Sequence, residues 1–209
     1  MINKDTKIYG SFSSSPGNNG CEFFNKEFKD RSINAIYKSF YSDDIKKSVE
    51  AVKTLSISGF AVSMPFKVEV LDLVDELTEE VESIGSANTI VNNNGYLTAY
   101  NTDYYGVKSY FETLNFSHIY IIGNGGFSKA VQYTCELMDK QFKIIDRDNW
   151  NLIDELRGVV LFNATPVEVK STRCIVFDGR PQSNSGRQIA LEQAKRQFEI
   201  YTGINYERD

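Results

Sequence analysis

An apolar strand that runs directly into a glycine turn and a helix constrains the fold of this chain more than any other segment. Residues 119–131 read IYIIGNGGFSKAV, with glycines at positions 123, 125 and 126. Such glycines let the backbone turn tightly and approach a pyrophosphate, and the helix behind them offers N–H donors and the positive end of its dipole. The pattern favours a dinucleotide site at Gly123, Gly125 and Gly126, with a plain tight turn as the alternative.

An acidic residue at the end of the next predicted strand supports a dinucleotide site. Asp146 ends the run FKIID at 142–146 and lies 23 residues after Gly123, close to the spacing of about 20 expected for an acid that binds the ribose 2′-hydroxyl. A solvated acid at a strand end is the alternative. Two more strands are predicted at 158–165 and 174–178, and strands that alternate with helices form a parallel sheet with helices outside.

The first hundred residues contain shorter elements and a hairpin signal. Asn94-Gly95 between two short runs is typical of a tight β-hairpin. Apolar residues at helical spacing predict helices, one of which begins at a cap formed by Ser42 or Asp43. In chain order the sequence predicts a strand at 6–10, a helix at 45–55, a strand at 60–64, a helix at 67–84, hairpin strands at 88–92 and 96–100, and helices at 104–114, 128–137 and 185–201.

Composition excludes several classes of protein. The chain has 23 Lys and Arg against 28 Asp and Glu and no basic run, so we expect no nucleic-acid partner. No apolar run approaches the roughly 20 residues of a membrane span, and the N-terminus shows no signal-peptide pattern, so we expect a cytoplasmic protein without a membrane partner. Three scattered cysteines indicate free thiols. With a single histidine, proton chemistry has to rely on Lys, Asp, Glu or Tyr.

A second group of polar residues falls at predicted strand ends and in the loops beside them. Taken one at a time, each is more typical of a solvated side chain than of a catalytic one. Because strand ends meet at one rim of an open α/β sheet, where ligands bind, their joint position is informative. Hydroxyls, amides and one Lys–Asp pair predict a pocket for a small polyhydroxylated acid. The group consists of Ser13, Ser15, Ser63, Lys67, Asn88 and Asp103.

Seven short motifs follow one another along the chain in a familiar order. They are SSSP at 13–16, SMPFK at 63–67, GSANTI at 85–90, NTD at 101–103, GNGGFSKA at 123–130, NATP at 163–166 and QAKRQFEIYTG at 193–203. In these motifs and their order the chain resembles the shikimate dehydrogenase family. The resemblance implies an oxidoreductase that interconverts 3-dehydroshikimate and shikimate, a small-molecule substrate, with NADP or NAD in aromatic amino acid (chorismate) biosynthesis.

The resemblance also assigns roles to the matching positions. Ser13 and Ser15 would hold the substrate carboxylate. Lys67, paired with Asp103, would carry the proton that accompanies hydride transfer, and no metal would be needed. The ring hydroxyls would be bound by Ser63, Asn88, Asp103 and Gln193. The cofactor would be bound by Gly123, Gly125, Gly126, Phe127, Asp146, Arg147, Asn163 and Thr165.

The implied fold is α/β with two domains. Residues 1–103 and the C-terminal helix at about 184–209 would form an N-terminal α/β substrate-binding, catalytic domain, and residues 104–183 a reduced Rossmann-like NAD(P)-binding domain. We expect Lys67 to face the glycine turn at 123–126 across a cleft between the domains. The protein is expected to be a monomer or a homodimer, and the sequence does not decide between the two.

The chain departs from the family pattern mainly in its cofactor half. Only 17 residues separate Asp146 from Asn163, an interval in which the family usually fits another helix and strand. The family's Asn-Arg-Thr at the adenosine 2′-phosphate is Asp146-Arg147-Asp148 here, so NAD and NADP both remain open. The alternative functions are a paralogue that acts on quinate or an aminoshikimate, and a shikimate-binding protein with impaired cofactor binding.

Overall fold

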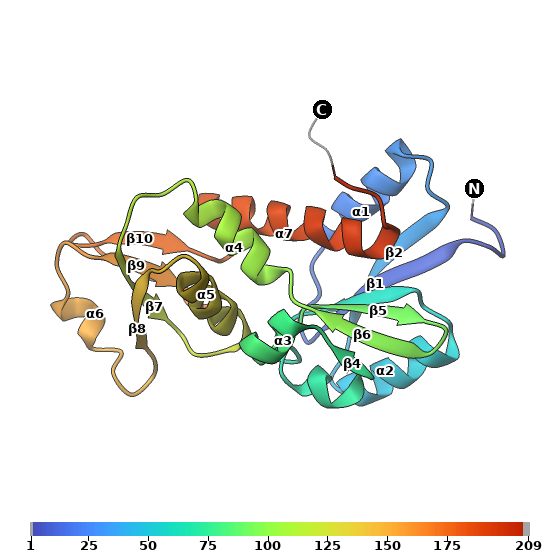
Figure 1. Cartoon of the computed structure of the whole chain (residues 1–209), viewed down its shortest axis with the longest axis horizontal. Coiled ribbons are helices and arrows are strands. Elements are labelled where there is room, and N and C mark those ends of the chain that lie inside the picture. Colours follow the sequence, from blue (N-terminus) through green and yellow to red (C-terminus); the bar gives the residue numbers. More distant parts are fainter. Residues whose placement is uncertain (1, 207–209) are drawn as a thin grey trace. The chain divides into compact units, whose positions relative to one another are not determined.

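The computed structural model describes residues 2–206 and divides the chain into two compact units (Figure 1). Unit 1 contains the residues up to Thr102 together with those from Ala194 onward, and unit 2 contains Asp103–Gln193. The last helix, α7 (Asn184–Thr202), therefore contributes to both units, whereas the sequence grouped all of it with the N-terminal residues. Each unit has its own sheet flanked by helices, which confirms the predicted α/β class.

Unit 1 is built on a six-stranded mixed sheet with the strand order β2-β1-β3-β5-β6-β4. The strand β1 runs parallel to both β2 and β3, while β5 is antiparallel to β3 and β6. Positive φ angles at Asn94 (53°) and Gly95 (96°) confirm the predicted hairpin, whose turn has two residues because β5 includes Asn93. The strands are β1 (Lys7–Ser13), β2 (Ala35–Tyr41), β3 (Gly59–Val62), β4 (Glu76–Leu77), β5 (Thr89–Asn93) and β6 (Tyr96–Tyr100).

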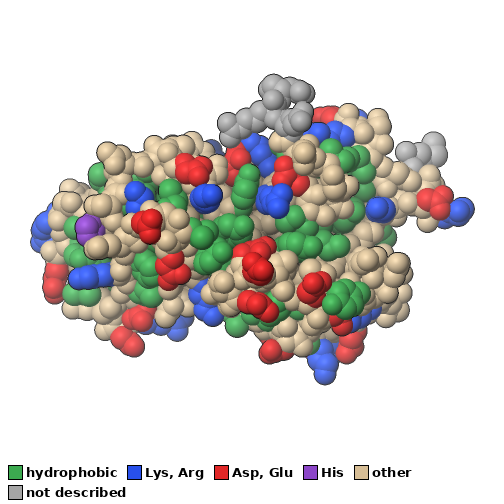
Figure 2. All heavy atoms as spheres, in the orientation of Figure 1, with side chains coloured by type: hydrophobic (Ala, Val, Ile, Leu, Met, Phe, Trp, Pro, Cys, Tyr) green, Lys and Arg blue, Asp and Glu red, His purple; other side chains and the backbone are tan. Residues whose placement is uncertain are grey.

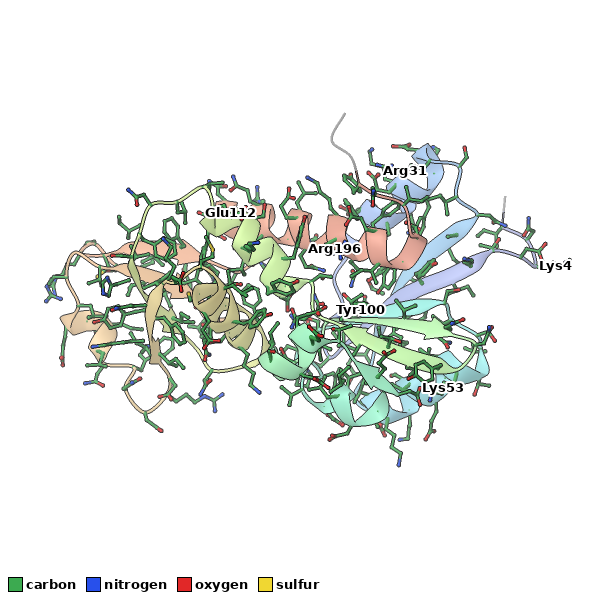
Figure 3. The ribbon with its side chains drawn as sticks, in the orientation of Figure 1. Lys4, Arg31, Lys53, Tyr100, Glu112 and Arg196 are labelled. Carbon is green, nitrogen blue, oxygen red and sulfur yellow. The ribbon has the colours of Figure 1, made fainter. Side chains whose placement is uncertain are left out.

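The two faces of the unit 1 sheet carry separate hydrophobic cores, because side chains alternate along β1. Phe12 packs on one face with buried residues of α2, and Tyr9 packs on the other with an aromatic cluster from α1, β2 and α7. The guanidinium of Arg31, labelled in Figure 3, lies 5.2 Å from the ring centre of Phe198 and 4.8 Å from that of Tyr206. The remaining helices of this unit are α1 (Asn19–Asp30), α2 (Ile45–Thr54), the 3-10 helix η1 (Glu69–Leu73) and α3 (Glu79–Ile84).

The single helix predicted over 67–84 is wrong, because this segment forms η1, β4 and α3. Asp75 interrupts the helix: its N–H donates to Leu97 O (2.9 Å), and its carboxylate accepts from the Leu97 N–H (2.7 Å). The second bond also lowers the pKa of Asp75. These contacts place β4 in parallel pairing with β6. The apolar residues that suggested a helix still reach the core, since Val70 and Val81 are fully buried.

The cap predicted for α2 is also wrong. Asp44, and neither Ser42 nor Asp43, is the N-cap residue, and its carboxylate accepts from the Lys47 N–H at 3.1 Å. This hydrogen bond lowers the pKa of Asp44. Ser42 stabilises the residues just before α2, because its hydroxyl accepts from the N–H of the cap residue Asp44 at 3.2 Å.

Unit 2 is built on a four-stranded, entirely parallel sheet with the order β10-β9-β7-β8. This order matches the central strands of a Rossmann sheet without its two outer strands, and the short interval between residues 146 and 163 predicts the loss of one of the two. The strands are β7 (His118–Ile122), β8 (Gln141–Ile145), β9 (Val160–Asn163) and β10 (Ile175–Asp178). The helices are α4 (Asp103–Phe111), α5 (Gly126–Leu137) and the single turn α6 (Leu152–Glu155), which the sequence did not predict.

Both faces of the unit 2 sheet are covered as well. Ile121 and Phe162 pack on one face against α4 and α5, and Ile122 and Leu161 pack on the other against α6. This double coverage explains why the strands read as short, nearly continuous apolar runs rather than as alternating ones.

All three cysteines are free, and burial raises the pKa of the Cys135 thiol to about 12. On the face drawn in Figure 2, Lys and Arg side chains are interspersed with Asp and Glu. Among residues 2–206, no helix is both long enough and apolar enough to cross a membrane. Within the same residues no group of three or more His, Cys, Asp or Glu is placed to hold a metal ion.

Two buried tyrosines of the aromatic cluster provide a matched test of this packing. The Tyr9 hydroxyl donates to Tyr201 O at 2.9 Å, whereas the Tyr201 hydroxyl is buried and has no hydrogen-bond partner among residues 2–206. An unpaired buried hydroxyl is costly, so we expect Tyr201→Phe to leave the free energy of unfolding unchanged or raise it by up to about 1 kcal/mol. Tyr9→Phe should lower it by about 1 kcal/mol. Urea unfolding of both variants measures this difference, and an equal loss in both would contradict the packing described.

Candidate functional site

The candidate substrate residues of unit 1 lie at the carboxyl ends of β1 and β3. Ser13 is the last residue of β1, and Ser63 follows β3 directly. The two ends are tied together because the Ser63 N–H donates to Phe12 O at 3.1 Å. The Ser14 hydroxyl adds a longer bond to Met64 O at 3.4 Å. The structure therefore brings Ser13 and Ser63 to one edge of the sheet, with Ser15 in the exposed loop after β1.

Lys67 reaches the same edge through a tight turn. The turn contains the cis peptide bond Met64–Pro65, and the Phe66 N–H donates to Ser63 O at 2.9 Å. The Phe66 ring is buried in the core of unit 1 and anchors the turn. Lys67 O then accepts from the Ala87 N–H at 2.8 Å, which places Lys67 beside the residue that precedes Asn88.

Asn88 is buried, and its carboxamide is oriented by a set of hydrogen bonds within unit 1. Its Oδ1 accepts from the Thr102 N–H (2.8 Å) and from the Thr89 hydroxyl (2.9 Å), while its Nδ2 donates to Thr102 Oγ1 (3.0 Å). Gln197 of α7 extends the set by donating to Thr89 Oγ1 at 2.6 Å. The sequence singled out Asn88 but not Thr89, Thr102 or Gln197, although all three lie within the quoted motifs.

The other two candidate substrate residues, Asp103 and Gln193, belong to unit 2. Asp103 is the first residue of α4 and is buried. Gly106, one turn later, makes the close approach of α4 and α7 possible. A Cβ at Gly106 would lie 2.4 Å from Ile189 O and 3.1 Å from the Gln193 Cβ. The structure thus brings α4, which begins at Asp103, against the stretch of α7 that carries Gln193.

The glycine turn after β7 is held in place by two hydrogen bonds. Gly123 has a φ of 107°, a conformation that favours glycine, and its N–H donates to Ile145 O at 2.7 Å. Its carbonyl accepts from the Ser128 hydroxyl at 2.6 Å. Ser128, which takes the place of the third glycine in the usual pattern, is fully buried. Gly125 is the N-cap of α5, and Gly126 is its first residue.

The loop after β9 lies against the glycine turn. A Cβ at Gly123 would be 2.8 Å from Thr165 Cγ2, so these two predicted cofactor residues are adjacent. Asn163 shapes the loop, because its Oδ1 accepts from the Thr165 N–H (3.0 Å) and hydroxyl (2.7 Å), and its Nδ2 donates to Val167 O (2.7 Å). The fully buried Asn163 side chain therefore stabilises the conformation of this loop.

Asp146 and Arg147 lie at the neighbouring strand end. Asp146 follows β8 directly, and Asp148 donates its N–H to Asp146 Oδ1 at 3.0 Å. The Asp146 N–H donates to Asn149 Oδ1 at 2.8 Å, so the turn over 146–149 is fixed by side chains of its own residues. Arg147 and Asp148 are exposed.

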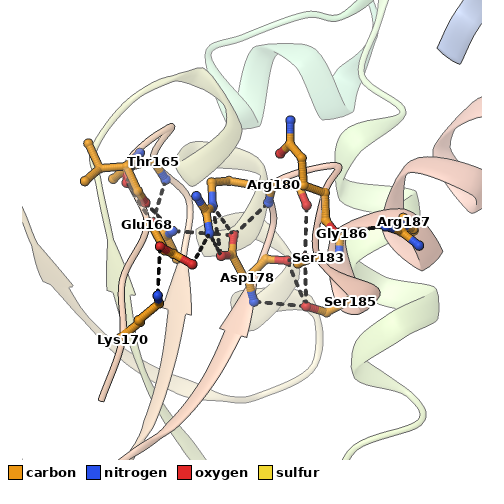
Figure 4. Close-up of polar contacts among 12 residues, drawn as sticks. Thr165, Glu168, Lys170, Asp178, Arg180, Ser183, Ser185, Gly186 and Arg187 are labelled. Atoms are coloured by element: carbon orange, nitrogen blue, oxygen red, sulfur yellow. Dashed lines mark hydrogen bonds and ion pairs between the residues drawn. The ribbon is translucent and has the colours of Figure 1, made fainter.

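A polar cluster after β10 completes this edge of unit 2, and the sequence assigned it no role (Figure 4). Asp178 holds the Arg180 guanidinium through bonds of 2.7 Å and 2.9 Å to its Oδ2, and this pairing raises the pKa of Arg180. The segment packs tightly, because a Cβ at Gly179 would lie 2.4 Å from the Phe127 ring. The Ser183 hydroxyl accepts from the Gly186 N–H at 2.8 Å and so caps the N-terminus of α7. A serine just before a helix is a typical N-cap, and this was the one feature of the cluster that could have been predicted from the sequence.

Comparison with known proteins relates this chain to one family. The sequence profile described as the shikimate dehydrogenase substrate binding domain matches residues 11–90. A shikimate dehydrogenase-like protein of Haemophilus influenzae is 42% identical over 134 residues, which cover 63% of this chain and 49% of that protein. A shikimate dehydrogenase (NADP(+)) of Pyrococcus furiosus is 41% identical over 138 residues, or 64% of this chain and 51% of the relative. The chain thus spans about half the length of these curated relatives.

Solved structures extend the similarity over nearly the whole chain. A shikimate dehydrogenase from Aquifex aeolicus superposes with a TM-score of 0.83 over 99% of this chain and 96% of its own, and at 23% identity this likeness shows the fold. A shikimate 5-dehydrogenase-like protein superposes with a TM-score of 0.80 at 30% identity, over 99% of this chain and 95% of its own. With this identity over almost the full length of a relative, the chain belongs to the shikimate dehydrogenase family.

Proposed function

We propose that the chain is a shikimate dehydrogenase-type oxidoreductase that interconverts 3-dehydroshikimate and shikimate with a nicotinamide dinucleotide. The observation that supports the proposal is that a single chain combines two edges at which the candidate substrate and cofactor residues gather. One edge presents Ser13, Ser63 and Lys67, and the other presents the glycine turn that begins at Gly123. Proteins of the same family are named shikimate dehydrogenase (NADP(+)), and one solved relative from Listeria monocytogenes is described in complex with shikimate and NAD.

The residues of unit 2 fit a dinucleotide. A Cβ at Gly125 would meet no atom within 4 Å, so the backbone at the start of α5 is open to a pyrophosphate. The N-terminal end of the α5 dipole favours an anion at this place. Asp146, at the end of β8, supplies a carboxylate for the adenosine ribose. The remaining proposed cofactor residues are Phe127, Arg147, Asn163 and Thr165. Asn163 would contribute indirectly, because its Oδ1 accepts from the Thr165 N–H and so positions Thr165.

The residues of unit 1 fit a small polyhydroxylated acid. The hydroxyls of Ser13 and Ser15 would donate hydrogen bonds to the substrate carboxylate, and Ser63 would bind ring hydroxyls beside them. Asn88, whose orientation is fixed through Thr102, would bind a ring hydroxyl as well. Gln193 and Asp103 would contribute from unit 2. We therefore assign substrate binding to unit 1 and dinucleotide binding to unit 2.

The proposed chemistry is a proton transfer coupled to hydride transfer. When bound, the nicotinamide ring supplies the acceptor or donor of the hydride. In the oxidation direction, Lys67 takes the proton from the hydroxyl oxygen on the carbon that loses the hydride, and in reduction it returns that proton to the carbonyl oxygen. The Lys67 ammonium also stabilises negative charge that develops on this oxygen. Asp103 would hydrogen-bond the same hydroxyl and orient it toward Lys67.

We further propose a cytoplasmic enzyme of aromatic amino acid (chorismate) biosynthesis that works as a monomer or homodimer, without nucleic-acid or membrane partners. The mixture of basic and acidic side chains on the face drawn in Figure 2 supports the proposal of no nucleic-acid partner. The direct test mixes the protein with shikimate and either NAD or NADP and follows reduced nicotinamide by absorbance. No reduction with either cofactor, under conditions in which the protein is folded, would refute the activity.

Two alternatives are favoured by particular observations. A quinate dehydrogenase from Corynebacterium glutamicum, in complex with NAD, shares the fold with a TM-score of 0.76 at 18% identity, so quinate belongs in the same assay beside an aminoshikimate. The four-stranded sheet of unit 2 favours a shikimate-binding protein with impaired cofactor binding. Calorimetry that detects shikimate binding but no dinucleotide binding would select this second alternative.

Replacing Lys67 tests the proposed proton transfer. Lys67→Ala should lower kcat by roughly 100-fold or more while KM changes little, because the role is confined to the transition state. Lys46→Ala, which removes an exposed lysine from α2 of the same unit, is the matched control and should keep full activity. Wild-type kcat in the Lys67 variant would remove this residue from the mechanism.

Replacing two glycines of the same turn separates cofactor binding from folding. Gly125→Val should weaken dinucleotide affinity at least tenfold without loss of stability, because its backbone is extended and the space around its Cβ is open. Gly123→Val should instead lower the free energy of unfolding by about 1 to 3 kcal/mol, because of its positive φ and the contact with Thr165. Calorimetric titration and urea unfolding measure the two effects. Unchanged dinucleotide affinity in the Gly125 variant would contradict the placement of the cofactor.

A further inference from the structure

We infer that unit 2 takes NAD in preference to NADP, and that Asp146 sets this preference. The inference rests on the proposed function and specifies its cofactor. Asp146 follows β8, the strand next to β7, and the Gly123 N–H donates to Ile145 O at 2.7 Å. Asp146 is therefore the residue directly after Ile145, whose carbonyl accepts the hydrogen bond from the glycine turn. In a parallel nucleotide-binding sheet, this strand end is where the adenosine ribose is bound.

The Asp146 side chain is fixed and still has an oxygen to offer. Its Oδ1 accepts from the Asp148 N–H at 3.0 Å, while its own N–H donates to Asn149 Oδ1 at 2.8 Å. Among residues 2–206 its Oδ2 has no hydrogen-bond partner within the protein. An ionised carboxylate only accepts hydrogen bonds, so this oxygen suits the hydroxyl donors of an unmodified ribose.

The 2′-phosphate of NADP has the wrong chemistry for this position. It replaces a hydroxyl donor by a group that is itself an anion, so the hydrogen bond to Asp146 is lost and a repulsion between like charges takes its place. Asp148 adds a second negative charge two residues later. Both effects act against NADP and leave the binding of NAD intact.

Arg147 is the residue of this turn that would favour the opposite preference. Its side chain is exposed and forms no ion pair with any of the residues 2–206. The carboxylates of Asp146 and Asp148 flank it in sequence, and Asp146 is held by two hydrogen bonds of the turn whereas no contact holds the guanidinium. In addition, β8 is an edge strand of its sheet, so no neighbouring strand on that side brings further cations to this end. We therefore expect the Asp146 carboxylate to influence the preference between NAD and NADP more than the exposed Arg147 guanidinium does.

A natural fluorescent probe for dinucleotide binding lies close to Asp146. Trp150 is the single tryptophan of the chain and lies four residues after Asp146. Its fluorescence is expected to change when the adenosine end of a dinucleotide binds, and this readout does not depend on turnover. Dissociation constants for NAD and for NADP can be measured in this way on the full chain, with calorimetry as an independent check.

The variants are chosen to keep the turn and change only its charge. Asp146→Asn retains an oxygen that can accept from the Asp148 N–H but loses the negative charge. Asp139→Asn makes the same change just beyond the opposite end of α5, where a positive φ of 51° also suits asparagine. Arg147→Gln tests whether the guanidinium binds the 2′-phosphate of NADP.

We expect the wild-type protein to bind NAD at least tenfold more tightly than NADP. Asp146→Asn should reduce this ratio to threefold or less, and Asp139→Asn should leave it unchanged. Equal or tighter binding of NADP by the wild type would overturn the inference, as would an unchanged ratio in Asp146→Asn or a tenfold loss of NADP affinity in Arg147→Gln. Each of these results would leave the proposed oxidoreductase in place. Failure of the wild type to bind either dinucleotide would refute the proposed function and this inference together.

Discussion

Each unit of this protein depends on one parallel strand that is paired on both sides. In unit 1 the chain leaves β1, adds β2 on one side and returns to add β3 on the other, and in unit 2 it does the same with β7, β8 and β9. In open α/β sheets ligands bind beside such a reversal, outside the carboxyl end of the central strand. Ser13 and Ser63 lie at this end in unit 1, and Gly123 and Thr165 lie at it in unit 2. The same topological constraint therefore produces both candidate ligand edges.

The sequence was most informative where local chemistry leaves few choices. Gly123 needs its positive φ and Asn94-Gly95 forms a two-residue turn, so the glycine turn and the hairpin were predictable. The 67–84 segment was not, because apolar residues at helical spacing also fit a strand pair that depends on the distant contact of Asp75 with Leu97. The helix α1 and strand β2 were missed, although the i, i+4 spacing of Phe24 and Phe28 was a helix signal for the aromatic cluster that they help to form.

The candidate site was predictable as a set of residues but only partly as a set of roles. Motifs pointed to Asn88 and Asn163, yet the structure shows that both side chains are engaged with neighbouring backbone, which no spacing in the sequence could indicate. The cluster of Asp178 and Arg180 was missed because neither residue lies in any of the seven motifs, so the resemblance assigned them no role. Its effect is to hold Gly179 against Phe127, beside the glycine turn.

The central claim is that one short chain keeps a working substrate edge and a working dinucleotide edge for a single reaction. A crystal structure of the protein with shikimate and NAD bound would test this claim most directly. We predict the pyrophosphate against Gly125 and the Lys67 amine within about 3.2 Å of a ring hydroxyl. Shikimate bound away from Lys67, or a glycine turn closed by the protein's own side chains, would contradict the claim.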